Sequence, residues 1–179
     1  MKLELGAGQR PTRGYSHNDL HPFDHIEHVG HPWMIDLPDN SLDEVLALAF
    51  IEHLTYEQAL DTFRNMARML KKGGRFYFDV PDYPKWASLY LRHLENGTND
   101  VAYNSFPDMA HCRRTLFGHQ RWPGDEHKYG WDSDHLSDTL GMCGLIAISW
   151  DVKPFTERAY RQRFWKPQDA HLYVTAAVE

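Results

Sequence analysis

The chain has 179 residues, a length typical of one domain, and its 42% hydrophobic and 25% charged residues indicate a folded globular protein. Lys and Arg total 19 against 25 Asp and Glu, giving a net charge of −6 with histidine neutral. All of this excess acid lies in residues 1–55, which hold three basic and nine acidic side chains. The charge balance argues against a general nucleic-acid partner, whose phosphates require a basic face.

Other classes of protein are excluded by short sequence features. The longest purely apolar run, residues 45–51, is far shorter than the ~20 residues of a membrane helix, and the N-terminus lacks the apolar core of a signal peptide. Cys112 and Cys143 are too few for a disulfide framework. We therefore expect a reduced, cytoplasmic protein.

Four short runs predict strands in the first half of the chain: residues 2–5, 15–19, 45–50 and 75–80. Between the last two lies the clearest helix, residues 56–70, whose apolar side chains recur at 3.6-residue spacing. Thr55 and Gln58 are spaced as a capping box at its start, and Gly73-Gly74 allow a left-handed exit at its end. Strand, helix and strand form a right-handed βαβ unit, so these two strands should be parallel.

The second half of the chain has mixed signals. A helix is expected over residues 84–95, followed by an irregular stretch, and a second helix from Asp132 or Ser133 to about Cys143. The last two strands are predicted over residues 145–150 and 172–177. Because repeats and linkers are absent from the sequence, we expect residues 1–179 to form one α/β domain.

A glycine turn follows the first predicted strand. Gly6-Ala7-Gly8 comes two residues after the carboxylate of Glu4, and glycines there let the backbone approach a ligand closely. A dinucleotide-binding fingerprint would place a third glycine at position 11, where this chain has Pro11, which argues against NAD or FAD. Alone, the turn is also compatible with an ordinary strand exit.

Together with four later blocks in the same order, this turn resembles the class I S-adenosylmethionine-dependent methyltransferases. The later blocks are Asn18-Asp19-Leu20, residues 36–45 (DLPDNSLDEV), Ile51-Glu52-His53-Leu54 and residues 70–76 (LKKGGRF). The resemblance covers residues 3–82 well and the remainder in outline. It implies an α/β, Rossmann-like three-layer sandwich with a mostly parallel sheet and an antiparallel last strand.

The resemblance also implies S-adenosylmethionine as the cofactor and assigns roles to matching residues. Gly6, Ala7 and Gly8 would pass under the methionine end of the cofactor, while Glu4 would orient the turn or meet the cofactor ammonium through water. Asp19 would accept both ribose hydroxyls, as acidic residues at the end of a second strand do, unless it is only a turn residue. Asp36, or the backbone beside it, would face the adenine amino group, although its surroundings are also good turn chemistry.

Phe50 and Ile51 would pack against the adenosine or methionine of that cofactor. The chain departs from the family because only eleven residues separate Gly8 from Asp19, so the first crossover helix should be abbreviated or missing. The chain also begins at the first strand, so a lid over the cofactor would come from residues 82–130 or a second subunit, or binding would be weak. The acidic residues 1–55 would provide a field suited to the sulfonium and ammonium of the cofactor.

Candidate catalytic residues follow the predicted strands, because ligands of open α/β sheets bind beyond the carboxyl ends of the strands. Glu52 and His53 follow the third strand, and Asp79 and Asp82 flank the end of the fourth. His127 lies in an acidic, basic and aromatic loop that loosely resembles a segment of small methyltransferases linked to polysaccharide and other small-molecule pathways. His53 or His127, each neutral near physiological pH, would be the base, with Asp82 as a further candidate. Each histidine could instead have a structural role.

Two other clusters have alternative interpretations. Five histidines lie at a spacing that suggests metal binding on a helix: His17, His21, His25, His28 and His31. Pro22, Gly30 and Pro32 would break such a helix, so we expect a solvated loop and no metal. Residues 153–169 interleave basic and aromatic side chains, which suits single-stranded nucleic acid or a phosphorylated substrate, but a surface or subunit contact is favoured.

The sequence therefore predicts a small enzyme, as a monomer or homo-oligomer, that methylates an oxygen or nitrogen of a small molecule such as a sugar or metabolite. One alternative is a protein of the same fold that binds the cofactor without catalysis, which the shortened first helix and absent lid would explain. Another is an RNA methyltransferase, which rests on the basic loop alone. That alternative is weakened because no Asn-Pro-Pro-Tyr-like tetrapeptide follows the third strand.

Overall fold

A seven-stranded sheet runs through the protein, whose computed structural model describes residues 1–96, 109–158 and 170–178. The strand order is β3-β2-β1-β4-β5-β7-β6, and the order reverses between β1 and β4. Neighbouring strands from β3 to β5 are parallel, whereas β7 is antiparallel to both β5 and β6. The expected Rossmann-like arrangement, with an antiparallel last strand, is confirmed.

The strands are β1 (Lys2–Leu5), β2 (Ser16–Asp19), β3 (His28–Val29), β4 (Leu42–Ala47), β5 (Leu70–Pro81), β6 (Leu145–Ser149) and β7 (His171–Val178). The helices are α1 (Tyr56–Met69), α2 (Tyr83–Asn96), α3 (Met109–Phe117), α4 (Ser133–Met142) and α5 (Lys153–Arg158). Two short 3-10 turns are η1 (Pro32–Met34) and η2 (Ile51–His53). In the parts of the chain that the structure describes, none of the helices has the length and apolarity needed to span a membrane.

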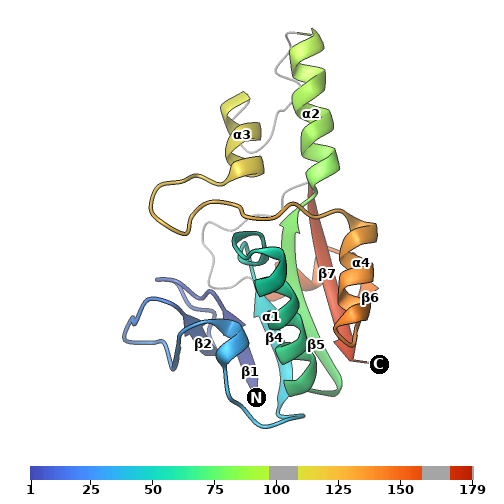
Figure 1. The fold of residues 1–179 in the computed structure, drawn as a ribbon. Helices are drawn as coiled ribbons and strands as arrows, with labels where there is room; N and C mark the ends of the chain where they lie inside the picture. The colour runs from blue at the N-terminus through green and yellow to red at the C-terminus, as the bar shows by residue number, and fades with distance from the viewer. Residues whose placement is uncertain (97–108, 159–169, 179) are drawn as a thin grey trace.

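Helix α1 begins with the capping box that the sequence predicts. The Thr55 hydroxyl accepts the Gln58 backbone N–H at 3.3 Å, and the Gln58 side chain accepts the Thr55 N–H at 3.0 Å. The helix packs its inner face on the sheet, where the buried ring of Phe63 contacts Phe76 and Phe78. Helix α4 lies beside α1 on the same face, over β6 and β7 (Figure 1). Together they enclose the larger hydrophobic core.

The connections around β2 contain no helix in the structure. An irregular loop joins β1 to β2, so the expected shortening of the first crossover helix is confirmed. Buried Glu4 organises this loop, because its carboxylate accepts the Thr12 backbone N–H at 2.7 Å and the Thr12 hydroxyl at 2.9 Å. The sheet face opposite α1 is covered by a smaller cluster that includes Tyr15 and Phe155.

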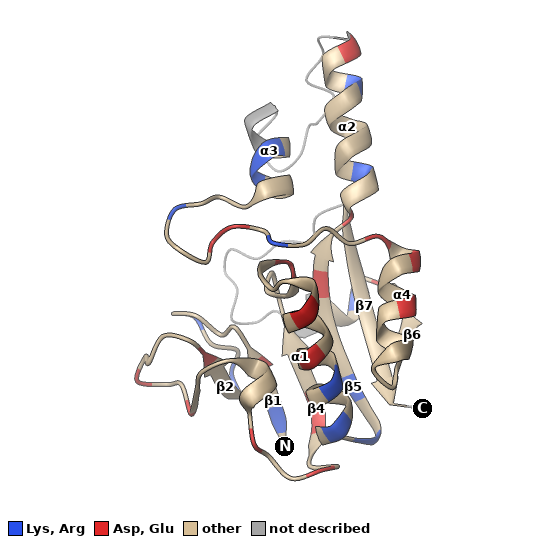
Figure 2. Cartoon of the chain, in the orientation of Figure 1, with Lys and Arg blue, Asp and Glu red and all other residues tan. Residues whose placement is uncertain are grey.

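Acidic residues of the N-terminal half lie near basic residues at the C-terminal end of α1 (Figure 2). Asp39 accepts a hydrogen bond from Arg68 at 2.5 Å, and Asp43 pairs with Lys71 at 2.7 Å. Asp43 also binds the N-terminal ammonium. These ion pairs tie the chain around the start of β4 to the end of α1 and the start of β5.

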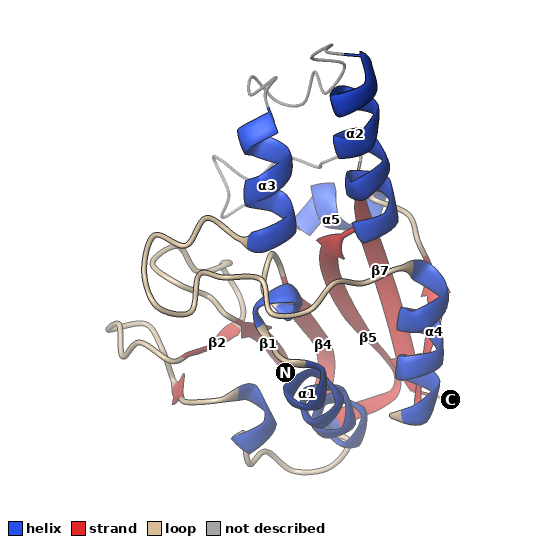
Figure 3. Cartoon of the chain, turned by 45° about the horizontal axis from the view of Figure 1, so that its top comes forward, coloured by secondary structure: helices blue, strands red, loops and turns tan. Residues whose placement is uncertain are grey.

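Helices α2 and α3 stand beyond the carboxyl end of β5 (Figures 1 and 3). They pack on each other around a separate small core of Trp86, Cys112, Leu116 and Ala170. The sequence predicted α2 closely, but it treated the residues of α3 as irregular and missed α5 and the two-residue strand β3. The segment 82–130, expected as a substrate-side insertion, thus has helical parts at the edge where ligands of such sheets bind.

Candidate active site

The glycine turn after β1 is held by the end of β2. Gly6 has φ +61° and Gly8 has φ +56°, in the left-handed region that favours glycine. The Ala7 N–H donates to the Asn18 carbonyl at 3.0 Å, and the Gly8 N–H donates to the Asp19 carboxylate at 2.8 Å. Asp19 is therefore a structural partner of the turn as well as a candidate ligand of a cofactor ribose.

Phe50, which follows β4, packs directly on this turn. A β-carbon at Gly6 would lie 2.3 Å from the Phe50 ring, whereas one at Gly8 would have nothing within 4 Å. In the structure as it stands, the packing of Phe50 accounts for the glycine at position 6. Open space beside the backbone, which a ligand could fill, is found at Gly8.

Three other residues expected at the cofactor, Glu4, Ile51 and Asp36, differ from one another in burial and position. Glu4 is fully buried under the loop that it organises, and Ile51 is fully buried in the larger core. Asp36 lines a cavity of about 360 Å³ beside β2 and β3. The other lining residues of that cavity are Asn18, Glu27, His28, Val29, Gly30, His31, Met34 and Ile35.

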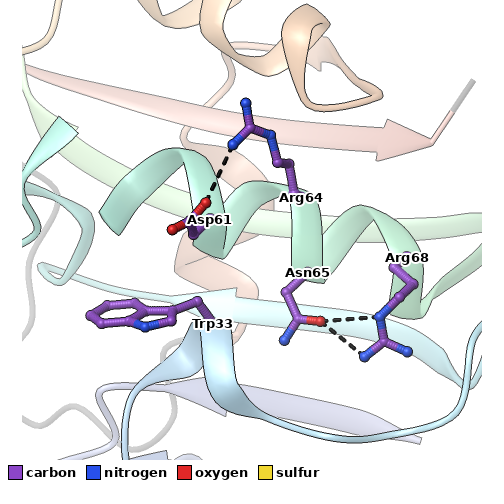
Figure 4. Close-up of a pocket in the computed structure, with 5 residues that line it drawn as sticks. All are labelled: Trp33, Asp61, Arg64, Asn65 and Arg68. Atoms are coloured by element: carbon purple, nitrogen blue, oxygen red, sulfur yellow. Dashed lines mark hydrogen bonds and ion pairs between the residues drawn. The ribbon is translucent and has the colours of Figure 1, made fainter. Parts of the chain in front are cut away.

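A second cavity, of about 340 Å³, lies between η1 and the outer face of α1 (Figure 4). Its lining residues are Trp33, Asp61, Arg64, Asn65 and Arg68. The polar side chains bond to one another, with Arg64 donating to Asp61 and Arg68 to Asn65. None of the residues predicted to bind cofactor or acceptor lines this cavity, so we do not place the active site there.

A cluster of buried acids and of buried or partly buried imidazoles lies around the carboxyl ends of β4 and β5. We call it the acid–histidine cluster, and its members are Glu52, His53, Asp79, His127 and His171. One potential ligand atom from each of Glu52, His53 and His127 lies within 4.8 Å of the others. The rings of His53 and His127 meet edge to face, with their centroids 4.9 Å apart. The structure thus brings together the two histidines that the sequence offered as alternative bases.

Asp79 connects the end of β4 to the start of β7. One carboxylate oxygen accepts the Ala49 N–H at 2.9 Å, and the other lies 3.2 Å from Nδ1 of His171. The His171 side chain is buried, and its Nε2 atom has no hydrogen-bond partner among the described residues. An imidazole oriented by a carboxylate in this way is suited to proton transfer.

Burial sets the ionisation of this cluster. It raises the pKa of Glu52 well above the usual range, and the nearby Asp79 carboxylate adds to that rise. Burial lowers the pKa of His127 to about 4, with His53 contributing in the same direction. Burial also lowers the pKa of His53. Both imidazoles are therefore neutral at physiological pH and can accept a proton or ligate a cation.

Asp82 lies directly after β5, where the sequence placed it. Its carboxylate accepts the Lys85 N–H at 3.2 Å and its carbonyl accepts the Trp86 N–H at 3.0 Å, so Asp82 caps α2. His171 is not predicted from the sequence. The antiparallel register that pairs Pro81 with His171 brings this residue to the end of β5, and no local motif indicates that pairing.

Comparisons with known proteins agree with this arrangement. Residues 17–78 match the family model described as a methyltransferase domain, while no curated protein sequence matches the chain. A putative methyltransferase from a complex with the Haloferax volcanii Trm112 activator is 16% identical, covers 99% of this chain and 81% of its own, and has a TM-score of 0.57.

Two further solved structures have the same fold. The 1,6-didemethyltoxoflavin-N1-methyltransferase of Burkholderia thailandensis is 14% identical, with 99% of this chain and 70% of that chain covered and a TM-score of 0.57. An S-adenosylmethionine-dependent methyltransferase of Clostridium acetobutylicum is 11% identical, with 99% and 83% covered and a TM-score of 0.57. Residues 17–78 are thus similar to a methyltransferase domain, and the chain has the fold of the class I, Rossmann-like methyltransferases that use S-adenosylmethionine.

Proposed function

We propose that the protein transfers a methyl group from S-adenosylmethionine to an oxygen or nitrogen of a small molecule, such as a sugar or metabolite. The observation that carries this proposal is the position of the glycine turn and the acid–histidine cluster. The turn follows β1, and Glu52 and His53 of the cluster follow β4; these are the two strands between which the strand order reverses. Open α/β sheets bind their ligands at this point.

The glycine turn fits a cofactor of this kind. Gly8 has open space over its backbone, and half-buried Asp19 accepts two backbone N–H groups among the described residues, from Gly8 and His21. A carboxylate offers about four acceptor positions, so Asp19 retains capacity for ribose hydroxyls. Gly6, Ala7, Gly8 and Asp19 would hold the cofactor, with Asp36 on the adenine side and Phe50 against it. Bound S-adenosylmethionine supplies a methyl group on a sulfonium.

The acid–histidine cluster would receive the acceptor. As the acceptor oxygen or nitrogen bonds to the methyl carbon and the carbon–sulfur bond breaks, its proton would pass to a neutral imidazole. His53 and His127 fit this role because burial keeps them neutral. His171 also fits, since Asp79 orients it and its Nε2 atom has no partner among the described residues.

The small size of the acceptor is supported by the Burkholderia thailandensis structure, which contains 1,6-didemethyltoxoflavin and S-adenosylhomocysteine. Helices α2 and α3 would cover the acceptor, because they stand at the carboxyl end of β5 (Figure 3). We also propose that the enzyme is cytoplasmic and that residues 1–179 form one domain.

Calorimetric titration with S-adenosylmethionine and S-adenosylhomocysteine tests the proposal. Wild type should bind both, and Asp19→Ala should bind at least ~10-fold more weakly, as expected for loss of charge-assisted hydrogen bonds. Asp24→Ala is the matched control, because Asp24 is an exposed acid in the next loop and should leave affinity unchanged. Absence of binding at millimolar cofactor would refute the proposal.

A transfer assay against small hydroxyl and amine compounds then identifies the acceptor class. Tight cofactor binding without transfer to any compound would favour a cofactor-binding protein that lacks catalysis. Binding of single-stranded RNA that is lost on neutralising Arg158, Arg161 and Arg163 would favour the RNA methyltransferase alternative. Most of the basic loop that carries these arginines, residues 159–169, lies outside the described residues.

A further inference from the structure

Three side chains of the acid–histidine cluster have the chemistry and spacing of a metal site. One ligand atom from each of Glu52, His53 and His127 lies within 4.8 Å of the others. Ligands held about 2.1 Å from a metal at octahedral or tetrahedral angles lie about 3.0–3.4 Å apart. Side-chain rotations that bring these atoms together by roughly 1.5 Å would therefore complete a coordination shell on one side of an ion.

Two potential ligand atoms of these residues are buried without a hydrogen-bond partner among the described residues. Among the described residues, neither Oε2 of Glu52 nor Nδ1 of His127 has a partner, and Glu52 is only 2% exposed. Buried polar atoms are almost always paired, because leaving them unpaired is unfavourable. A cation between them would satisfy both atoms at once.

The remaining imidazole nitrogens are already fixed by backbone carbonyls. Nδ1 of His53 lies 3.1 Å from the carbonyl oxygen of Glu126, and the His127 ring is hydrogen-bonded to the backbone of Thr115. Histidines that bind metals typically donate their second nitrogen to such a carbonyl, which fixes the tautomer and the ring orientation. This arrangement leaves Nε2 of His53 and Nδ1 of His127 as the acceptor nitrogens.

The backbone also holds the two ligand-bearing segments together. The Lys128 N–H donates to the Glu52 carbonyl at 2.8 Å, so the loop that carries His127 is fastened to η2. Residues 52–53 and 127 are therefore positioned before any ion binds, as a specific metal site requires.

We propose that Glu52, His53 and His127 bind one divalent transition-metal ion, whose remaining positions are open to the acceptor. Two imidazoles and one carboxylate suit Zn²⁺, Fe²⁺, Co²⁺ or Mn²⁺, and three protein ligands leave positions for an exchangeable oxygen or nitrogen. No metal is expected from the sequence, in which the histidines of residues 17–31 are the cluster with metal-like spacing. The site found here combines residues from two distant segments.

This ion would deepen the proposed function, on which its catalytic role rests. A hydroxyl bound to the metal loses its proton more readily. That proton would pass to Nε2 of His171, while the oxygen forms its bond to the methyl carbon and the carbon–sulfur bond breaks. His53 and His127 would then act as ligands, and His171 would be the imidazole of the cluster that remains available as a base.

Titration of the chelator-treated protein with CoCl₂ tests the site, with the visible absorption of bound Co²⁺ as the signal. Wild type should bind one equivalent, and Glu52→Gln and His127→Gln should each weaken the affinity by at least ~100-fold, since loss of an outer-shell partner alone weakens metal binding 10–100-fold. The control is His21→Gln combined with His31→Gln, which alters the histidine-rich segment and should leave the titration unchanged.

Thermal unfolding provides a second measurement and checks the fold of each variant. Co²⁺ should raise the melting temperature of wild type and of the control, but not that of Glu52→Gln, which remains folded because it loses only an unpaired buried carboxyl oxygen. No binding by wild type, equal affinity in Glu52→Gln, or loss of binding in the control would overturn the proposal. The cobalt titration contains no S-adenosylmethionine, so its result does not depend on the proposed methyl transfer. A failure of the proposed function would appear in the separate cofactor titration.

Discussion

Substitution of Gly6 by alanine tests how closely Phe50 packs on the glycine turn. The new methyl group would lie 2.3 Å from the Phe50 ring, and its backbone would have to keep φ at +61°. The left-handed conformation costs an L-residue about 1–2 kcal/mol. Forced overpacking adds about 1–3 kcal/mol, so the free energy of unfolding should fall by roughly 2–5 kcal/mol.

Gly8→Ala is the matched control for this substitution. Gly8 has φ +56° but nothing within 4 Å of an added β-carbon, so only the conformational cost of about 1–2 kcal/mol applies. Phe50→Ala should relieve the overpacking at position 6 and leave the effect of Gly8→Ala unchanged. Urea unfolding of the single and double variants forms a double-mutant cycle that isolates the contact.

A coupling energy of about 1 kcal/mol or more between positions 6 and 50 is the expected outcome of that cycle. Two results would refute the reasoning. The first is a Gly6→Ala variant no less stable than Gly8→Ala, and the second is a cost that Phe50→Ala does not reduce.

Three further predictions concern ionisation and capping. The folded pKa of His127, about 4, is below its ordinary value of 6.5, so the unfolded chain binds more protons between these pH values. The free energy of unfolding of the metal-free protein should therefore fall by up to about 3 kcal/mol as pH drops from 6.5 to 4, and His127→Gln should flatten that decline. The Arg121 guanidinium lowers the pKa of Asp125 from 3.8 to about 2, so its stabilisation is present above pH 3.8 and lost as pH falls to 2. Arg121→Ala should cost about 1 kcal/mol at neutral pH in chemical unfolding, because the pair is partly exposed to solvent. Asp82→Ala should destabilise the protein by ~1 kcal/mol through loss of the α2 cap, whereas Asp82→Asn should restore stability and retain kcat. A 100-fold lower kcat in Asp82→Asn would instead identify Asp82 as catalytic.

The parts of the fold that the sequence predicted well are those with strong local signals. The capping box at Thr55 and Gln58 and the apolar periodicity that follows define α1, and Asp132 caps α4 at one of the two positions expected. Weak local signals explain the omissions. The strand β3 has only two residues, and α3 depends on contacts with α2 around Trp86 that no local pattern reveals.

The candidate site was only partly predictable for the same reason. The residues after β4 and β5 could be placed at one edge of the sheet because parallel strands end together. Which of them meet was not evident, since His127 arrives on a loop and His171 through the antiparallel pairing of β7 with β5. Glu4 holds the loop after β1, which agrees with the role in orienting the turn that the sequence offered, and Asp82 caps α2.

Many of the acidic side chains of residues 1–55 are buried or form ion pairs within the protein. Glu4, Glu44 and Glu52 are buried, and Asp39 and Asp43 form ion pairs with Arg68 and Lys71. A broad negative field that attracts the cofactor, as the composition suggested, would need these charges to be exposed and unpaired. Under the proposed function, recognition would instead rest on short-range contacts at Gly8 and Asp19.

Cofactor affinity should therefore depend little on ionic strength. Raising NaCl from about 50 to 500 mM shortens the screening length from more than 10 Å to about 4 Å, which weakens long-range attraction far more than contacts at hydrogen-bond distance. Calorimetric titration with S-adenosylmethionine at the two salt concentrations should give dissociation constants within about threefold of each other. The exposed Asp39→Asn variant should behave like wild type, because its charge is already offset by Arg68. A tenfold loss of affinity at high salt, or a marked loss in Asp39→Asn, would show that the acidic half attracts the cofactor through its field.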